Sequence, residues 1–211
     1  MIIGTYPFPD SDGLSNTICI PPFRHPNVLH RGTRKYALPE GWCGFGLAID
    51  ESEFERRDIF SNWDMAFHGT KKDTAVEMLK NDWQLLCPGD VTASGYSIPV
   101  RPGHITGTFT RTNEDTGEPE QFDPQQVFTS PSIKYCAYST VYCDVTRYRG
   151  KRFKVAFQLR QEPGTYSIGQ QTVGARSTID PLFANSELEY YTKRKGVHKL
   201  TRLMIQLDSA D

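Results

Sequence analysis

The sequence predicts an α+β domain built from short strands and few helices. Several short segments alternate apolar and polar residues, as half-buried strands do, while only two segments have clear amphipathic helical spacing. Loops rich in Gly, Pro, Thr and acidic residues separate these segments. Because the strands do not alternate regularly with helices, an α+β arrangement is favoured over a doubly wound parallel sheet.

The composition is that of one globular domain. The 211 residues include 37% hydrophobic and 12% aromatic residues, enough to fill a core. The formal net charge of −1 gives no global field toward nucleic acid or anionic lipid, so a phosphate-bearing ligand must be held locally. No basic, apolar leader and no membrane-length apolar run is present in the sequence. We therefore expect an intracellular protein, cytoplasmic or mitochondrial, without a membrane partner.

The five cysteines predict free thiols and no metal site. They are odd in number and scattered, which makes a poor disulfide framework for a chain of this size. Only Cys136 and Cys143 lie close together, and the six residues between them do not fit the usual zinc spacings. The others are Cys19, Cys43 and Cys87.

The first part of the chain predicts an N-terminal arm and elaboration over residues 1–60. Six of the 14 prolines fall within residues 1–41, a density that breaks helices and interrupts sheets. Residues 41–50 alternate as a half-buried strand does, and the charged segment 51–64 fits either a linker or a short helix. The main domain is then expected over residues 61–211.

Two strand-to-helix units follow. An apolar strand over residues 65–70 leads into a helix over 73–83, with Asp73 as a candidate cap. A strand at 127–129 leads into a helical pattern over 132–142. The intervening stretch 86–126 has loop composition, with its tip at 113–121, and further strands are expected at 154–160, 186–192 and 200–207.

Three separated segments suggest a function. The His68-Gly69-Thr70 segment ends the first strand, VFTSPSIKYCAY occupies 127–138, and SELEYY occupies 186–191. This order resembles the catalytic domain of ADP-ribosyltransferases of the diphtheria-toxin and poly(ADP-ribose) polymerase type, the His-Tyr-Glu class. Within that class it looks most like the transferase-like region of Neuralized-like proteins. The resemblance covers about residues 63–207 and implies the ADP-ribosyltransferase fold, with two packed, mainly antiparallel sheets.

The resemblance implies an NAD site. His68 would hydrogen-bond the adenosine ribose, with Thr70 nearby, and the Gly69 backbone would pair with the nicotinamide carboxamide, which glycine allows to come close. Tyr138 would stack on the nicotinamide ring. The implied NAD contacts also include Ser130 and Tyr135.

Two positions depart from the family pattern. With Tyr138 aligned as the stacking residue, Val127 stands where the class has its triad tyrosine. Tyr135 stands where a small serine normally meets the carboxamide. This implies that nicotinamide is gripped from one face only.

Two carboxylates complete the expected site. If residues 186–192 form a strand, Glu187 and Glu189 point to the same face. By resemblance, Glu189 is catalytic: it would bond the nicotinamide-ribose 2′-hydroxyl and stabilise the developing cation. Glu187, at the end of the loop 169–187, would recognise the acceptor. The E-x-E pair also resembles the Arg-Ser-Glu class, but His68 and its neighbours occupy the place of that class's arginine.

The expected activity is mono-ADP-ribosyl transfer. NAD is the substrate, nicotinamide is released, no metal takes part, and the acceptor is a protein or a nucleic acid. Alternatives are NAD glycohydrolysis, the more distant RNA 2′-phosphotransferase chemistry, and an inactive module that binds NAD, ADP-ribose or a protein.

Overall fold

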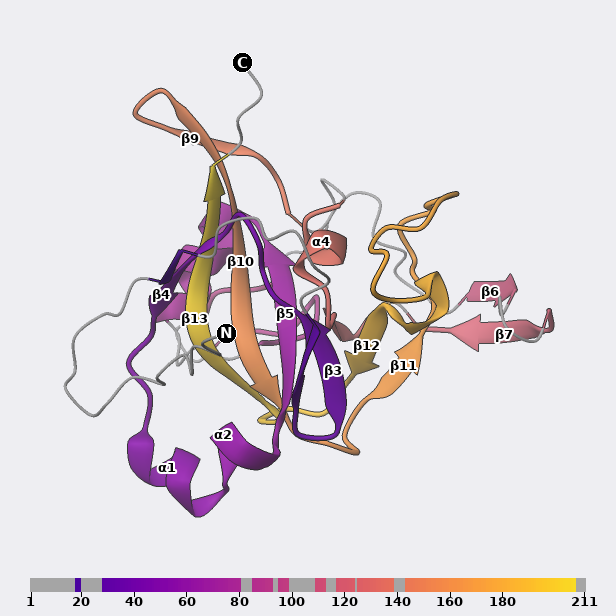
Figure 1. The fold of residues 1–211 in the computed structure, drawn as a ribbon, viewed down its shortest axis with the longest axis horizontal. Coiled ribbons are helices and arrows are strands. Elements are labelled where there is room, and N and C mark those ends of the chain that lie inside the picture. The colour runs from indigo at the N-terminus through magenta and orange to yellow at the C-terminus, as the bar shows by residue number, and fades with distance from the viewer. Residues whose placement is uncertain are drawn as a thin grey trace, which may run out of the picture.

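The fold is an α+β arrangement of mostly antiparallel sheets with few helices, which confirms the expected fold class (Figure 1). A computed structural model describes residues 18–19, 28–80, 85–92, 95–98, 109–112, 117–123, 125–138 and 143–207. The strands are β1 (Ile18–Cys19), β2 (Val28–Arg31), β3 (Arg34–Ala37), β4 (Cys43–Gly46), β5 (Asp64–Thr70), β6 (Phe109–Thr112), β7 (Pro119–Phe122), β8 (Val127–Thr129), β9 (Thr146–Tyr148), β10 (Lys151–Gln161), β11 (Ser167–Gly169), β12 (Glu189–Thr192) and β13 (His198–Leu207). The helices are α1 (Glu51–Arg56), α2 (Ile59–Asn62), α3 (Lys72–Lys80), α4 (Ile133–Cys136) and the 3-10 turn η1 (Asn185–Glu187).

The larger sheet has the strand order β1-β4-β13-β10-β5, with β9 paired to β10. Its centre is the long pair β10 and β13, whose register shifts by a bulge between Gln158 and Leu159. Strands β1 and β4 belong to this sheet although they precede residue 60. The boundary expected at residue 60 therefore falls within one sheet, because strands from both sides of it belong to that sheet.

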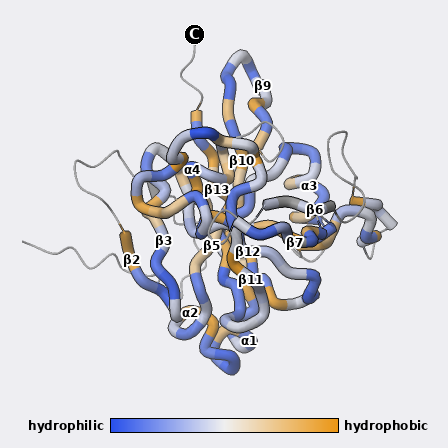
Figure 2. The backbone as a smooth tube through the Cα atoms, turned by 90° about the vertical axis from the view of Figure 1, so that its right-hand side faces the viewer, coloured by the Kyte–Doolittle hydropathy of each residue, from blue (hydrophilic) through white to orange (hydrophobic). Residues whose placement is uncertain are grey.

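The smaller sheet, β11-β12-β8, packs against one face of the larger one. Alternate residues of a strand face opposite sides, so Ala66 of β5 and Phe157 of β10 point toward Tyr190 of β12, and all three are buried. The opposite face of β5 carries Phe67, which packs against α4. Figure 2 shows the hydrophobic stretches concentrated where these strands meet in the centre of the molecule.

The helices are short and locally capped. The Asp50 side chain accepts from the Glu53 backbone N–H and caps α1, so the charged segment after residue 50 is helical rather than a plain linker. Helix α3 already includes Lys72, which puts Asp73 inside the first turn instead of at the cap. Ser132 caps the single turn of α4. The remainder of the two expected helices, 81–84 and 139–142, lies outside the described residues.

Three features differ from the sequence expectations. The hairpins β2–β3 and β6–β7 lie in stretches expected to be irregular, while 113–116 of the expected loop tip lies outside the described residues.

Cys43 is disulfide-bonded, and the residue opposite it in the β1–β4 register is Cys19, so the expectation of free thiols is wrong for Cys43. Sheet pairing, which sequence spacing does not reveal, brings these two backbone positions together. Cys87, Cys136 and Cys143 are free.

Along the described residues, no helix is both long and apolar enough to cross a membrane.

Candidate functional site

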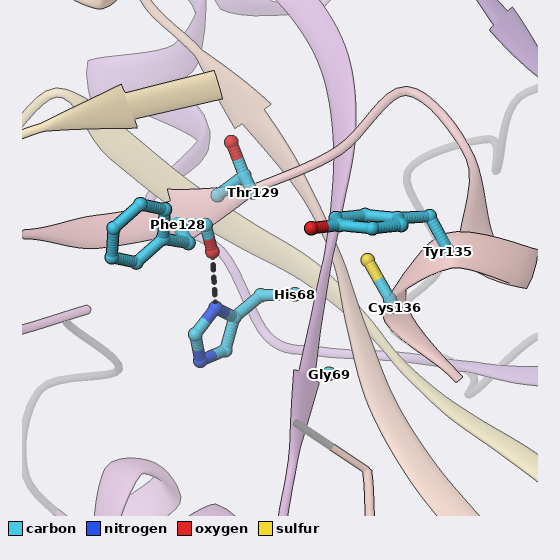
Figure 3. A pocket seen from close by; sticks show the side chains of 6 residues that line it. All are labelled: His68, Gly69, Phe128, Thr129, Tyr135 and Cys136. Atoms are coloured by element: carbon cyan, nitrogen blue, oxygen red, sulfur yellow. Dashed lines mark hydrogen bonds between the residues drawn. The ribbon is translucent and has the colours of Figure 1, made fainter. Parts of the chain in front are cut away.

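A pocket lies where β5 of the larger sheet separates from β8 of the smaller one. The two strands meet at Phe67 and Ser130, whose backbones exchange hydrogen bonds of 2.8 and 2.9 Å. Beyond this bridge, β5 continues along β10 and β8 continues along β12. The gap between them holds about 240 Å³ of empty space, part of it open to solvent. Its lining residues are His68, Gly69, Phe128, Thr129, Tyr135 and Cys136 (Figure 3).

The Gly69 backbone forms one wall of this pocket. Phe67 directs its N–H and C=O toward Ser130, away from β10. In an antiparallel pair this direction alternates along the strand, so the N–H and C=O of Gly69 also point away from β10, into the gap. Without a side chain, Gly69 allows a flat ligand amide to come close to its backbone.

His68 closes the same wall through its side chain. Its Nδ1 lies 2.7 Å from the Phe128 carbonyl oxygen, and the other ring nitrogen points away from Phe128 (Figure 3). Because a carbonyl oxygen only accepts, Nδ1 donates its hydrogen. In the neutral imidazole, Nε2 then carries a lone pair that can accept from a hydroxyl group.

Tyr135 forms the opposite wall, reaching from α4 toward β8 (Figure 3). It is held in place because Ser132 caps its helix and because its ring is buried. The neighbouring Cys136 donates its thiol to the Phe67 carbonyl at 3.3 Å. Burial raises the pKa of the Cys136 thiol well above its usual value, so this wall carries no thiolate.

The Tyr135 hydroxyl connects the pocket to Glu189. Tyr135 donates a short hydrogen bond to Glu189 Oε1. The same carboxylate oxygen accepts from the Thr172 hydroxyl at 2.5 Å and from the Thr172 backbone N–H at 3.3 Å. The side chain of Glu189 is fully buried, at 0% exposure. The Thr172 backbone N–H also lies 3.1 Å from the Tyr135 hydroxyl, so Tyr135 and the loop that carries Thr172 together cover this carboxylate oxygen.

Glu187 lies outside this arrangement. It ends the turn η1, and Leu188 still has helical backbone angles, so β12 begins only at Glu189. Glu187 is exposed whereas Glu189 is buried. The expectation that both carboxylates share one strand face is therefore wrong, because the alternation rule does not apply across a 3-10 turn.

The remaining predicted site residues, Tyr138, Thr70 and Ser130, do not line the pocket. Tyr138 is 51% exposed and does not line the pocket, so its ring lies on the surface beyond α4. Thr70 and Ser130 are buried; the Ser130 backbone makes the bridge to β5, and its hydroxyl accepts from the Ser132 N–H at 3.1 Å. Val127, the position of the family tyrosine, is buried in the core.

The sequence missed four contributors: Phe128, Thr129, Cys136 and Thr172. Three of them lie inside a segment that the sequence did single out. Thr172 lies inside the loop 169–187, which the sequence also singled out, but no sequence pattern identified this residue within it.

The interior behind the pocket is buried and contains an uncharged histidine. The hydroxyl of Thr129 donates to Gln161 Oε1 at 2.5 Å. Opposite Gln161 on β13 stands His198, buried at 5% exposure. Burial, and secondarily the nearby charge of His68, lowers the pKa of His198 to about 3. His198 is therefore an uncharged ring at neutral pH.

Among the described residues, no group of three His, Cys, Asp or Glu side chains is placed to hold a metal ion. No family model of known proteins matches the sequence. No solved structure matches it either. Any function proposed for this site therefore rests on its geometry.

Proposed function

We propose that this chain is a mono-ADP-ribosyltransferase of the His-Tyr-Glu class, with the ADP-ribosyltransferase fold. It takes NAD as substrate, transfers ADP-ribose to a protein or nucleic-acid acceptor and releases nicotinamide. One observation carries the proposal: Tyr135 lines a pocket opposite His68 and Gly69, and its hydroxyl holds the Glu189 carboxylate. Two segments that are far apart in the sequence thus line one pocket, and a third adjoins it through the hydrogen bond between Glu189 and Tyr135.

The reaction gives each group a task. The bond between the ribose anomeric carbon and the nicotinamide nitrogen breaks, and its electron pair leaves with nicotinamide. The anomeric carbon becomes cationic, bonds to the acceptor nucleophile, and the acceptor loses a proton. Glu189 would stabilise the cation, because a preoriented carboxylate in a dry site interacts strongly with developing positive charge. The Gly69 backbone would hold the carboxamide, and His68 Nε2 would accept from a ribose hydroxyl.

The proposal requires the loop that carries Thr172 to open. Even with the adjoining open solvent counted, the gap holds only about 240 Å³, below the ~300–1,000 Å³ of ordinary small-molecule pockets and too little for a whole dinucleotide. Glu189 is also covered by Thr172. Displacing Thr172 would free the carboxylate oxygen to accept from the ribose. Exposed Glu187, at the end of the same loop, would meet the acceptor.

The burial of Glu189 favours a second candidate, a module that binds NAD or ADP-ribose without turnover. In that case Glu189 serves only to fix the loop, through Tyr135 and Thr172.

Incubation with NAD labelled in its adenylate half separates these functions. Label on an added acceptor protein or oligonucleotide, absent with Glu189→Gln, supports the transferase. Free ADP-ribose alone indicates a glycohydrolase. Saturable binding with neither product indicates the module, and no binding at all overturns the proposal.

A further inference from the structure

The hairpin of β9 and β10 carries a dense run of positive charge. It extends beyond the rest of the molecule in both views (Figures 1 and 2). Within the eight residues from 147 to 154 the chain has five cations and no acidic residue. They are Arg147, Arg149, Lys151, Arg152 and Lys154. The side chains from 147 to 151 are exposed, so this charge faces solvent.

The register of the hairpin places like charges side by side. Arg147 is directly opposite Arg152, an arrangement that weakens an antiparallel pair. At the tip, Arg149 has a left-handed backbone with φ of 48°, a conformation that favours Gly, Asn or Asp. The hairpin therefore has cations at positions where other residues would make it more stable. A bound polyanion would relieve the repulsion.

Within the described residues, carboxylates do not pair with the outer cations of the hairpin. Elsewhere, exposed lysines pair with acids, as Lys72 does with Asp73 and Lys80 with Glu77. In the described part of the chain, Arg147, Arg149 and Lys151 have no such ion pair. Their charges are thus available to a partner.

An aromatic ring lies within this charged run. Tyr148 is 61% exposed and stands opposite Lys151, and the Arg149 guanidinium lies 5.2 Å from its ring centre. At the base of the hairpin, Lys154 donates to the carbonyl of Ala137 at 2.9 Å, and the residue after Ala137 in the sequence is the exposed Tyr138. Cations interleaved with exposed rings suit a strand that offers both phosphates and unpaired bases.

We propose that the β9–β10 hairpin binds single-stranded nucleic acid. Arg147, Arg149 and Lys151 contact phosphates, and Tyr148 stacks on a base. A membrane surface would call for a larger apolar face than one tyrosine provides. An acidic peptide would use the cations but would leave the exposed ring without a role. The proposal is independent of the NAD chemistry, because it concerns binding through a different element.

The test is fluorescence anisotropy with labelled single-stranded RNA and DNA of about 20 nucleotides, longer than the ~4–16 nucleotides of typical sites. Three phosphate contacts predict that log K falls with log salt at a slope of about −2. The triple variant Arg147→Ser, Arg149→Ser, Lys151→Ser should lose about tenfold or more in affinity and flatten that slope. Tyr148→Ala should lose at least about fivefold, since stacking on one base is lost.

A matched control removes the paired charges of α3, in the double variant Lys72→Ser, Lys80→Ser, which should bind as the wild type does. Equal binding by the hairpin triple variant overturns the proposal. So does an effect of charge without an effect of Tyr148→Ala, which means that the hairpin attracts polyanions without stacking on a base. Binding to vesicles with anionic lipid in the absence of oligonucleotide binding also overturns it.

Discussion

The two walls of the pocket differ in how far a ligand can reach them. On β5, His68 and Gly69 are partly exposed, and the Gly69 backbone faces the gap. Behind the opposite wall, which Tyr135 forms, Glu189 of β12 has no exposed surface and is bonded to Tyr135 and Thr172. A ligand can therefore reach the β5 wall, whereas the loop that carries Thr172 covers Glu189. Binding and turnover should therefore respond differently to substitutions on the two sides.

The largest expected effect is at the closed wall. Glu189→Gln keeps the size of the side chain and an oxygen to accept from Tyr135, but it removes the charge that favours the oxocarbenium-like state. NAD turnover should fall by about 10² or more while NAD binding and the melting temperature change little. Glu55→Gln on exposed α1 is the control. Wild-type turnover in the Glu189 variant contradicts a catalytic role.

The second prediction tests whether the interior behind both walls is dry. His198 has a folded pKa of about 3, below the ~6.5 of an unfolded chain. Between these values only the unfolded chain takes up the proton, so stability is lost as pH falls from ~6.5 toward 3, by up to ~1.4 kcal/mol per pH unit. Chemical unfolding between pH 7 and 4 should show less pH dependence for His198→Leu than for exposed His30→Leu. Equal slopes would mean that water reaches His198.

A third prediction concerns the open wall. A methyl group at Gly69 would point to the face of Phe67 and α4, into the pocket. Overpacking of this kind costs ~1–3 kcal/mol, so Gly69→Ala should weaken NAD binding about tenfold in calorimetric titration. Gly46→Ala is the matched control, because an added Cβ there meets no atom within 4 Å. Equal affinities for the two variants would move the ligand away from β5.

The smallest effect should come from the loop that separates the two walls. Thr172→Val keeps the shape of the side chain but removes the hydroxyl that bonds Glu189. One lost hydrogen bond is worth ~1 kcal/mol, so a loop released by that amount should raise turnover about two- to fivefold. Thr201→Val, whose hydroxyl bonds the Gln158 carbonyl within the larger sheet, is the control. A fall in turnover for Thr172→Val would mean that Thr172 orients the carboxylate instead of covering it.

The sequence predicted those features that depend on neighbouring residues. Alternation located β10, and the short apolar run that ends at His68-Gly69-Thr70 located β5. The glycine-containing end of β5 was identified from adjacent residues, and the structure puts His68 and Gly69 in the pocket.

Features that depend on distant residues were missed. The β2–β3 hairpin turns at Gly32 and Thr33, and Asp64, 31 residues beyond Thr33, anchors it by accepting from the Thr33 N–H at 2.6 Å. The partners of Glu189 lie 54 and 17 residues away, at Tyr135 and Thr172. The E-x-E spacing failed for a local reason, since a 3-10 turn interrupts the strand before Glu189.

The most direct test is a crystal structure of this protein soaked with NAD. The nicotinamide ring should lie between Gly69 and Tyr135, with its carboxamide on the Gly69 backbone and with Thr172 displaced from Glu189. NAD bound away from this pocket, or the pocket empty at NAD concentrations that saturate binding in solution, would contradict the proposed function.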